Sequence, residues 1–288
     1  MNFMATESGH TPSRFQTHVH RPAMNQLVST QYDIGLVALS FAFAVIGSFV
    51  ALSAATGVRR PSGRLNLSNV LTVGVALGGV GVWSMHFIGM LALQMDVGSS
   101  YSMTETFASL VVVVVAASLA VRYAAHNPES LPRLAVAGTG LGLSVVVMHY
   151  MGMFGLKIYG FIDWNWLLVG LSVVIAVVAS TVALWLAFNT PTLSRRVLAA
   201  VAMGVAVCAM HYTGMAAAEF ICTTDTRSAI PQGSGFISSF RLPSLVIVTT
   251  VLMTVMLSLD QGFQYLRHRQ TRSMARALQA RAAAARRA

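Results

Sequence analysis

The sequence predicts an all-α membrane protein with seven transmembrane helices, and two observations carry this prediction. Charged side chains make up only 10% of the 288 residues, where a soluble domain has about 25%, and 55% of the residues are hydrophobic. The apolar residues also form seven long stretches, each long enough to cross a bilayer as a helix. This composition excludes a soluble enzyme, a disordered chain and an ordinary basic nucleic-acid-binding protein.

Each predicted span follows from the thickness of the bilayer. A hydrocarbon core of about 30 Å needs about 20 apolar residues at 1.5 Å each. The spans are 33–55, 68–93, 105–125, 134–156, 165–188, 197–219 and 243–265. Such long runs without polar alternation exclude a β-barrel. We therefore expect a membrane domain over 33–265, preceded by a flexible extracytoplasmic tail over 1–31.

The basic residues predict the orientation of the spans, because cytoplasmic loops carry an excess of Lys and Arg. Fourteen of the 19 basic residues fall on one side of the predicted membrane, and seven of these follow residue 266. The other seven are Arg59, Arg60, Arg64, Arg122, Arg133, Arg195 and Arg196. The prediction is a multi-pass protein of the cell membrane, N-out and C-in, with a basic cytoplasmic helix or tail over 266–288.

A six-residue motif occurs three times in the chain without gaps. The copies are 85–90 (MHFIGM), 148–153 (MHYMGM) and 210–215 (MHYTGM). Their histidines are 63 and 62 residues apart, which equals two spans with their loops. The motif therefore falls on the second, fourth and sixth spans, and helices 1–2, 3–4 and 5–6 form three predicted repeats, with the seventh helix added.

The similarity between the repeats extends to small residues around each histidine. A glycine stands seven residues before each histidine, a valine four before and a second glycine three after. These glycines are Gly79, Gly142 and Gly204, and then Gly89, Gly152 and Gly214. Such offsets share one face of a helix, and small residues let membrane helices approach closely. We expect the glycines to pack helices rather than to bind a ligand.

The histidines and methionines of the motif are suitable metal ligands. A thioether is a soft ligand that suits Cu(I), and imidazole suits copper generally. The first expected ligands are His86, His149 and His211, with Met90, Met153 and Met215 one turn later on the same face. The methionines before each histidine, Met85, Met148 and Met210, lie about 100° around the helix and converge less directly. Ionisable groups at membrane depth are costly, so three at matched positions indicate a shared site.

The repeated motif resembles the MHYT domain of bacterial membrane sensors. The copy at 210–213 reads MHYT letter for letter, while the first copy has Phe87 and Ile88 and the second has Met151 in place of the family residues. The resemblance covers about residues 33–265. It implies copper binding through these His and Met residues and the sensing of a diatomic gas such as oxygen, carbon monoxide or nitric oxide. It also implies that the last helix leads to an output domain; since none follows here, we expect a separate cytoplasmic partner or a simple anchor.

The sequence also leaves two alternative functions and the roles of several residues beside the histidines to be decided. Phe87, Tyr150 and Tyr212 follow the histidines, where a tyrosine hydroxyl would suit a bond to a ligating His, although Phe87 cannot form one. Cys208 is a less favoured extra ligand. The alternative functions are a copper transporter, which needs ligands continuing toward the cytoplasm, and a haem-binding electron carrier. The sequence offers no catalytic constellation and no nucleic-acid-binding motif, so an enzyme is not expected.

Overall fold

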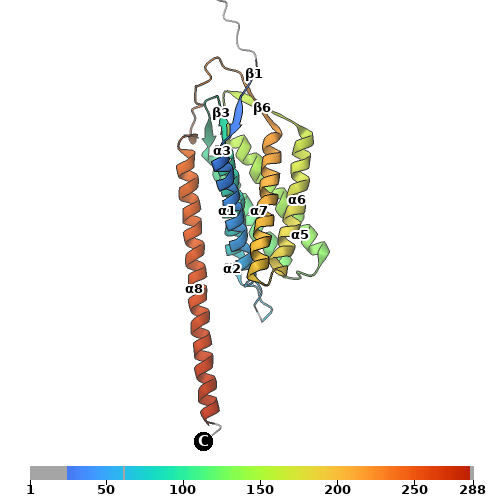
Figure 1. Cartoon of the computed structure of the whole chain (residues 1–288), viewed down its shortest axis with the longest axis vertical. Helices are drawn as coiled ribbons and strands as arrows, with labels where there is room; N and C mark the ends of the chain where they lie inside the picture. The colour runs from blue at the N-terminus through green and yellow to red at the C-terminus, as the bar shows by residue number, and fades with distance from the viewer. Residues whose placement is uncertain (1–24, 61, 286–288) are drawn as a thin grey trace, which may run out of the picture.

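The computed structural model describes residues 25–60 and 62–285 and is built mainly of long helices (Figure 1). The helices are α1 (Ile34–Ala55), α2 (Leu67–Gly74), η1 (Val75–Trp83), α3 (Ser84–Ala92), α4 (Met103–Ala125), α5 (Leu131–Gly155), α6 (Trp166–Asn189), α7 (Leu193–Ala216) and α8 (Leu242–Ala285). The segment α2–η1–α3 is one continuous rod. Within the described residues, seven helical rods are long and apolar enough to cross a membrane, which confirms the predicted number of spans.

Polar residues start several of these helices. The side chains of Asp33, Ser130, Asn165 and Thr192 accept hydrogen bonds from backbone N–H groups in the first turns of α1, α5, α6 and α7. These N–H groups have no partner inside a helix, so a capping side chain fixes the first residue. The cap at Thr192 starts α7 four residues before the predicted boundary at 197, because the first turn of this helix carries arginines rather than apolar residues.

The second membrane-spanning rod departs from a regular α-helix. Residues Val75–Trp83 form a π-helix between α2 and α3, in which one turn holds more residues than in an α-helix. This rod is also the most enclosed of the seven. Its backbone approaches α1 so closely that a Cβ atom on Gly47 would overlap the backbone of Gly81. The sequence pattern predicts a uniform helix here and gives no indication of the π-helix.

Short antiparallel strands at one end of the bundle close each pair of helices. The paired strands are β2 (Thr30–Tyr32) with β3 (Leu93–Met95), β4 (Ser100–Ser102) with β5 (Leu156–Lys157), and β6 (Gly160–Trp164) with β7 (Ala218–Cys222). In each pair, one strand precedes an outer helix and the other follows a motif helix. The chain therefore contains three strand–helix–helix–strand repeats, in agreement with the predicted helix pairs. We call this end of the bundle the strand end and the opposite end the loop end.

Two further strands widen this layer, and one of them corrects a predicted boundary. Strand β1 (Gln26–Leu27) pairs with β7, and β8 (Phe236–Ser238) pairs with β4. Residues 26–31, predicted to belong to the flexible tail, thus contain β1 and most of β2, because their backbone groups pair with β7 and β3. Residues 1–24 of the predicted tail lie outside the described residues.

An ion pair joins two loops at the strand end. The guanidinium of Arg227 donates a hydrogen bond to the Asp96 carboxylate at 2.8 Å and lowers the pKa of that carboxyl.

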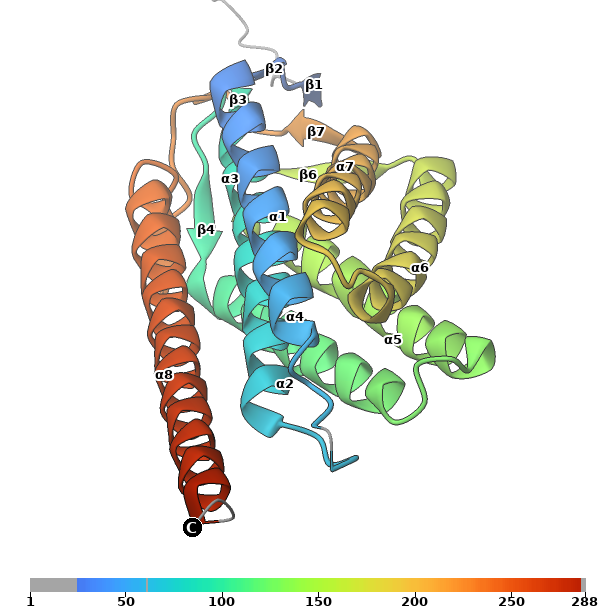
Figure 2. The same cartoon turned by 60° about the horizontal axis from the view of Figure 1, so that its bottom comes forward.

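The last helix, α8, lies outside the six-rod bundle and packs against η1 and α3 (Figure 2). Its second half continues beyond the other helices at the loop end (Figure 1). Polar contacts join it to the second rod: Thr250 contacts Ser84, with 2.8 Å between the hydroxyl oxygens, and Asp260 accepts hydrogen bonds from Ser68 and Thr72. The rod that carries the first histidine is therefore the one on which α8 rests.

Candidate metal centre

The three motif histidines occupy equivalent places on the three motif helices. His86 lies on α3, His149 on α5 and His211 on α7, and their exposed fractions are 1%, 0% and 0%. Each stands five or six residues before the end of its helix, so the rings lie about 9 Å below the strand end at 1.5 Å per residue. Among His, Cys, Asp and Glu side chains of the described residues, these three form the one group close enough to share a metal ion.

The histidine rings meet through their Nδ1 atoms. The distances between these atoms are 3.1 Å from His86 to His211, 3.2 Å from His149 to His86 and 3.3 Å from His211 to His149. The ring planes stand at 71–86° to one another, so the edges converge and the faces do not stack. We call this arrangement the Nδ1 triangle.

The Nδ1 triangle contains a conflict that hydrogen bonds cannot remove. Each Nδ1 carries either a proton or a lone pair, so among three mutually adjacent atoms at least two are of the same kind. At least one contact therefore brings together two lone pairs or two N–H groups. A cation at the centre accepts all three lone pairs at once and removes the conflict.

The size of the triangle fits a small metal ion. The point equidistant from the three Nδ1 atoms lies about 1.8–1.9 Å from each, whereas a zinc–imidazole bond measures about 2.0–2.1 Å. The rings would need to move outward by only about 0.2 Å. The donor set also fits, because neutral imidazole is a common ligand of copper and zinc.

The opposite nitrogen of each ring faces a glycine on the next motif helix. A Cβ atom would overlap Nε2 of His86 if placed on Gly152, Nε2 of His149 if placed on Gly214, and Nε2 of His211 if placed on Gly89. The contacts run in one direction around the triangle, from each repeat to the next. Glycine three residues after each histidine is thus what admits the neighbouring ring. These Nε2 atoms have no hydrogen-bond partner in the described structure.

The aromatic residues beside the histidines do not donate to them. The hydroxyl of Tyr150 lies 2.8 Å from the Ser172 hydroxyl on α6, and that of Tyr212 lies 3.0 Å from the Ser40 hydroxyl on α1. Each serine already donates to a carbonyl three residues earlier, at 2.7 Å, so the tyrosine is the donor. The idea of a tyrosine–histidine bond is therefore wrong, because the hydroxyls point outward to the next helix. The rings of these tyrosines and of Phe87 contact the adjacent histidine edge to face, with centroids 4.7–4.8 Å apart.

In the first repeat, the hydrogen bond to the next repeat comes from Trp83, a residue that the sequence motif does not indicate. Phe87 has no hydroxyl, and Trp83 supplies the donor instead: its Nε1 lies 3.2 Å from the Ser109 hydroxyl on α4. Ser109 also donates to the carbonyl three residues before it. A signal for two of these serines was present, since Ser109 and Ser172 each stand 23 residues after a motif histidine. Each repeat is thus hydrogen-bonded to the next around the closed bundle.

The methionines of the motif are enclosed near the triangle. Met85, Met90, Met148, Met153, Met210 and Met215 are all at most 3% exposed. Met90, Met153 and Met215, each four positions after a histidine, lie on the helical turn toward the strand end. Met210 lines a cavity on the other side of the triangle. Cys208 is half-buried on α7 and lies outside the histidine group, so it is not brought to the triangle.

The remaining predicted glycines bring the rods together at other levels. A Cβ atom on Gly142 would overlap the backbone of α6, one on Gly204 would meet Val45 of α1, and one on Gly79 would meet the Met253 sulfur on α8. The upstream glycines thus contact outer helices, whereas the glycines of the motif contact histidines.

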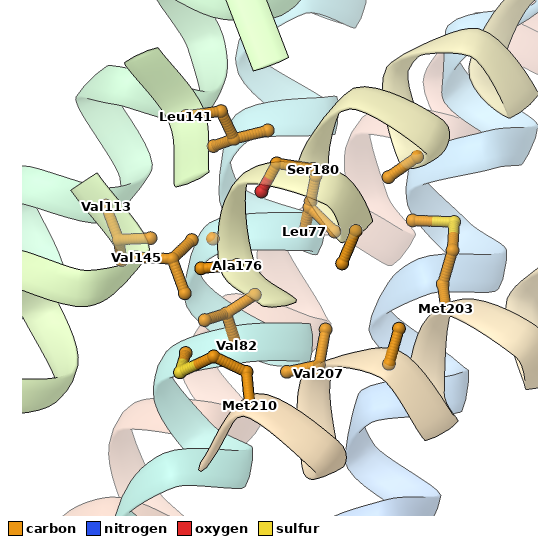
Figure 3. A pocket seen from close by; sticks show the side chains of 14 residues that line it. Leu77, Val82, Val113, Leu141, Val145, Ala176, Ser180, Met203, Val207 and Met210 are labelled. Atoms are coloured by element: carbon orange, nitrogen blue, oxygen red, sulfur yellow. The ribbon is translucent and has the colours of Figure 1, made fainter. Parts of the chain in front are cut away.

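An apolar cavity of about 40 Å³ lies on the loop-end side of the triangle. Figure 3 shows side chains that line it. Its lining includes the valines four residues before each histidine, Val82, Val145 and Val207, so it begins one helical turn from the rings. Helix α6 closes it with Ala176, Ala179, Ser180 and Ala183. The stripe of valines predicted beside the histidines is therefore the roof of this cavity.

Comparisons with known proteins identify the family to which the chain is similar. The profile of the MHYT family, described as a bacterial signalling protein N terminal repeat, matches residues 22–67, 79–137, 142–200 and 204–277. No solved structure matches the chain. The matched segments include all three histidines.

Curated relatives are considerably longer than this chain. The bifunctional diguanylate cyclase/cyclic di-GMP phosphodiesterase MucR of Pseudomonas aeruginosa is 34% identical over 80% of this chain and 34% of its own length. The signaling protein YkoW of Bacillus subtilis is 28% identical over 67% of this chain and 25% of its length. The cyclic di-GMP phosphodiesterase NbdA of Pseudomonas aeruginosa is 30% identical over 66% of this chain and 25% of its length. The chain thus spans between a quarter and about a third of these relatives, and its three repeats and family profile together establish that it belongs to the MHYT family of membrane signalling proteins.

Proposed function

We propose that this chain is a sensor in the cell membrane that binds one copper ion at the Nδ1 triangle and detects a diatomic gas there. The Nδ1 triangle is the observation that carries the proposal. Three buried imidazole nitrogens converge on one point, and a cation there would make all three of their mutual contacts favourable at once. The surrounding thioether side chains favour copper over zinc, because soft sulfur ligands suit Cu(I).

The chain contributes geometry and an apolar environment to this site. His86, His149 and His211 would hold the ion, and a bound copper ion would supply an open coordination position for a small ligand. The three buried methionines four residues after the histidines, Met90, Met153 and Met215, exclude water from the strand side and provide soft donors close by. The valine-lined cavity gives an uncharged diatomic molecule space beside the ion.

In this proposal, α8 transmits the signal from the metal site. The helix contacts the second rod through Ser84, which lies two residues before His86. A shift of the ring on metal or gas binding would therefore reach α8 through one hydrogen bond. The names of MucR and NbdA describe cyclic di-GMP enzymes. We propose a cytoplasmic signalling partner of α8, because this helix continues beyond the other helices at the loop end.

The two alternative functions fit the geometry less well. A transporter needs ligands along a path, yet the space below the triangle is lined by Val, Leu, Ala, Gly and Met with a single serine. A haem needs its two axial histidines on opposite faces of a porphyrin. Nδ1 atoms within 3.3 Å of one another leave no room for that ring.

Metal analysis of the purified full chain tests the proposal. Wild type loaded with Cu(I) under anaerobic conditions should retain about one copper per chain, and replacement of all three histidines by Ala should abolish this. His126→Ala is the matched control, because His126 is exposed and its ring bonds only to the carbonyl of Arg122 among the described contacts. Carbon monoxide added to the copper-loaded wild type should change its spectrum. Wild type without copper, or a triple variant with unchanged copper, contradicts the proposal.

The methionine contribution can be separated in the same assay. Replacing Met90, Met153 and Met215 together by Leu keeps volume and removes sulfur, and should weaken Cu(I) binding at least about tenfold while Zn(II) binding changes little. Met256→Leu is the control, because this methionine is 70% exposed on the lipid-facing side of α8. Equal losses for both metals would show that the sulfur atoms do not coordinate the ion.

A further inference from the structure

A second apolar space adjoins the cavity below the Nδ1 triangle. It is a groove of about 430 Å³ on the outer surface of the bundle, between α6 and α7. The groove and the cavity share three lining residues, Ala179, Met203 and Ala206. These three residues, which we call the shared layer, border both spaces, and two of their side chains are single methyl groups.

The outer surface beside this layer faces lipid. The groove is lined by exposed valines of α6, and both helices belong to the set long and apolar enough to span a membrane. The groove therefore opens to the hydrocarbon phase rather than to water. On the strand side, by contrast, the buried methionines one turn above the histidines and the strands close the approach.

The cavity itself selects for ligand chemistry. A volume of about 40 Å³ exceeds the roughly 10–15 Å³ that one water occupies by this measure, so a molecule of two or three heavy atoms fits. A buried water needs two to four polar partners, and the hydroxyl of Ser180 is the single polar side chain in the lining. Small apolar cavities of this kind stay dry and accept uncharged apolar molecules such as xenon.

We infer that the cavity binds a small uncharged apolar molecule that enters from the bilayer between α6 and α7, past Met203. Figure 3 shows the Met203 side chain at the edge of the cavity on α7, with Met210 near its other end. Methionine has three rotatable bonds and an unbranched chain, so Met203 can move aside where a branched residue could not. Apolar solutes concentrate in hydrocarbon relative to water, which makes the lateral route the favoured one.

This inference rests on the proposed function, because the cavity lies one helical turn from the ring atoms that would hold the ion. Its physical content does not require the ion. Occupancy of the cavity and copper content can therefore be measured separately, and either can fail without the other.

Xenon is the probe for the test. The full chain is placed in lipid nanodiscs with its methionine methyl groups labelled with ¹³C, and spectra are recorded under increasing xenon pressure. The methyl signals of Met203 and Met210 should shift and saturate, whereas xenon merely dissolved in lipid gives shifts that rise linearly. Shifts without saturation at both methionines would overturn the inference.

Two pairs of variants on α7 locate the ligand and its route. Ala206→Leu fills the shared layer and should weaken xenon binding at least about tenfold, while Ala209→Leu, at an exposed position outside both spaces, should not. Ala202→Phe obstructs the groove alone and should slow xenon exchange without lowering occupancy, compared with the exposed control Val205→Phe. Unchanged binding in Ala206→Leu overturns the site, and unchanged exchange in Ala202→Phe overturns the route. Copper content in all four variants reports whether the metal centre has folded.

Discussion

At the scale of the residue, the most informative feature of the molecule is the mutual contact of three imidazole edges. The Nδ1 triangle is unfavourable without a cation, since at least one of its contacts joins two like groups, and each buried Nε2 has no partner. An unpartnered buried polar group costs about 1–3 kcal/mol. Functional sites commonly contain side chains that destabilise the protein when no ligand is bound.

Metal removal and a single histidine substitution should therefore have distinguishable effects. Wild type should unfold at a higher temperature with copper than without it, by an amount equivalent to about 4 kcal/mol at free metal a thousand times Kd. His149→Gln should lose this increase, yet the metal-free variant should be no less stable than metal-free wild type, because the conflict between like groups is relieved. Thermal unfolding with and without copper measures both. An equal increase in the two proteins would argue against coordination by the triangle.

The motif glycines give the second prediction at this scale. Gly152→Ala adds a methyl group that overlaps Nε2 of His86, so the ring must rotate away and copper affinity should fall at least about tenfold. Gly140→Ala, on the same helix, meets nothing within 4 Å and should leave copper binding unchanged. Isothermal titration of both variants with Cu(I) provides the comparison. Matching affinities would show that the glycine is not what admits the ring.

The sequence was sufficient to predict which residues converge but not how they touch. Three histidines with a period of 62–63 residues on alternate helices had to meet at one depth, as they do. Helical periodicity says nothing about ring rotation, so the choice of Nδ1 over Nε2 and the contact of each glycine with the following histidine were beyond it. The tyrosine hydroxyls were misassigned for the same reason, since their serine partners lie on helices whose rotation the pattern leaves free.

At the scale of the element, the long apolar rods were predictable and the departures from them were not. The length of a span is fixed by bilayer thickness, which explains why the predicted bounds of the seven spans agree with those of the apolar helical segments to within four residues. The π-helix at Val75–Trp83 lies where the second rod approaches α1 closely, and the strands form by pairing between distant chain segments. Strands of two to five residues carry no periodic signal that the sequence alone could display.

The contact between α8 and the second rod gives the prediction at this scale. Ser84→Ala and Thr250→Val each remove one partner of a buried hydrogen bond between the hydroxyls. A double-mutant cycle should yield a coupling energy of about 0.6 kcal/mol, the average for bonds between membrane helices. Unfolding in mixed detergent measures the four proteins. Spin labels on α8 should also show that copper moves the helix less in Thr250→Val than in wild type; additive energies and an unchanged movement would remove this bond from the signalling route.

At the scale of the whole molecule, three repeats close into a bundle with one repeated contact scheme. Each histidine rests on the glycine of the next repeat, and Trp83, Tyr150 and Tyr212 each donate to a serine of the next repeat. The third repeat returns to the first through α7 and α1. Because every repeat supplies one histidine, the Nδ1 triangle exists only in the closed bundle.

The charges of the chain predict the direction of the bundle in the membrane, and this direction decides which side of the membrane the triangle lies near. The arginines at 59, 60, 64, 122, 133, 195 and 196 all belong to loops or helix ends at the loop end, which the excess of basic residues predicts to be cytoplasmic. After Cys208 and Cys222 are replaced by Ser, a cysteine at Gln232 of the strand end should react with an impermeant maleimide on intact cells. A cysteine at Glu129 of the loop end should react only after lysis. The reverse pattern would place the triangle, about 9 Å from the strand end, near the cytoplasm.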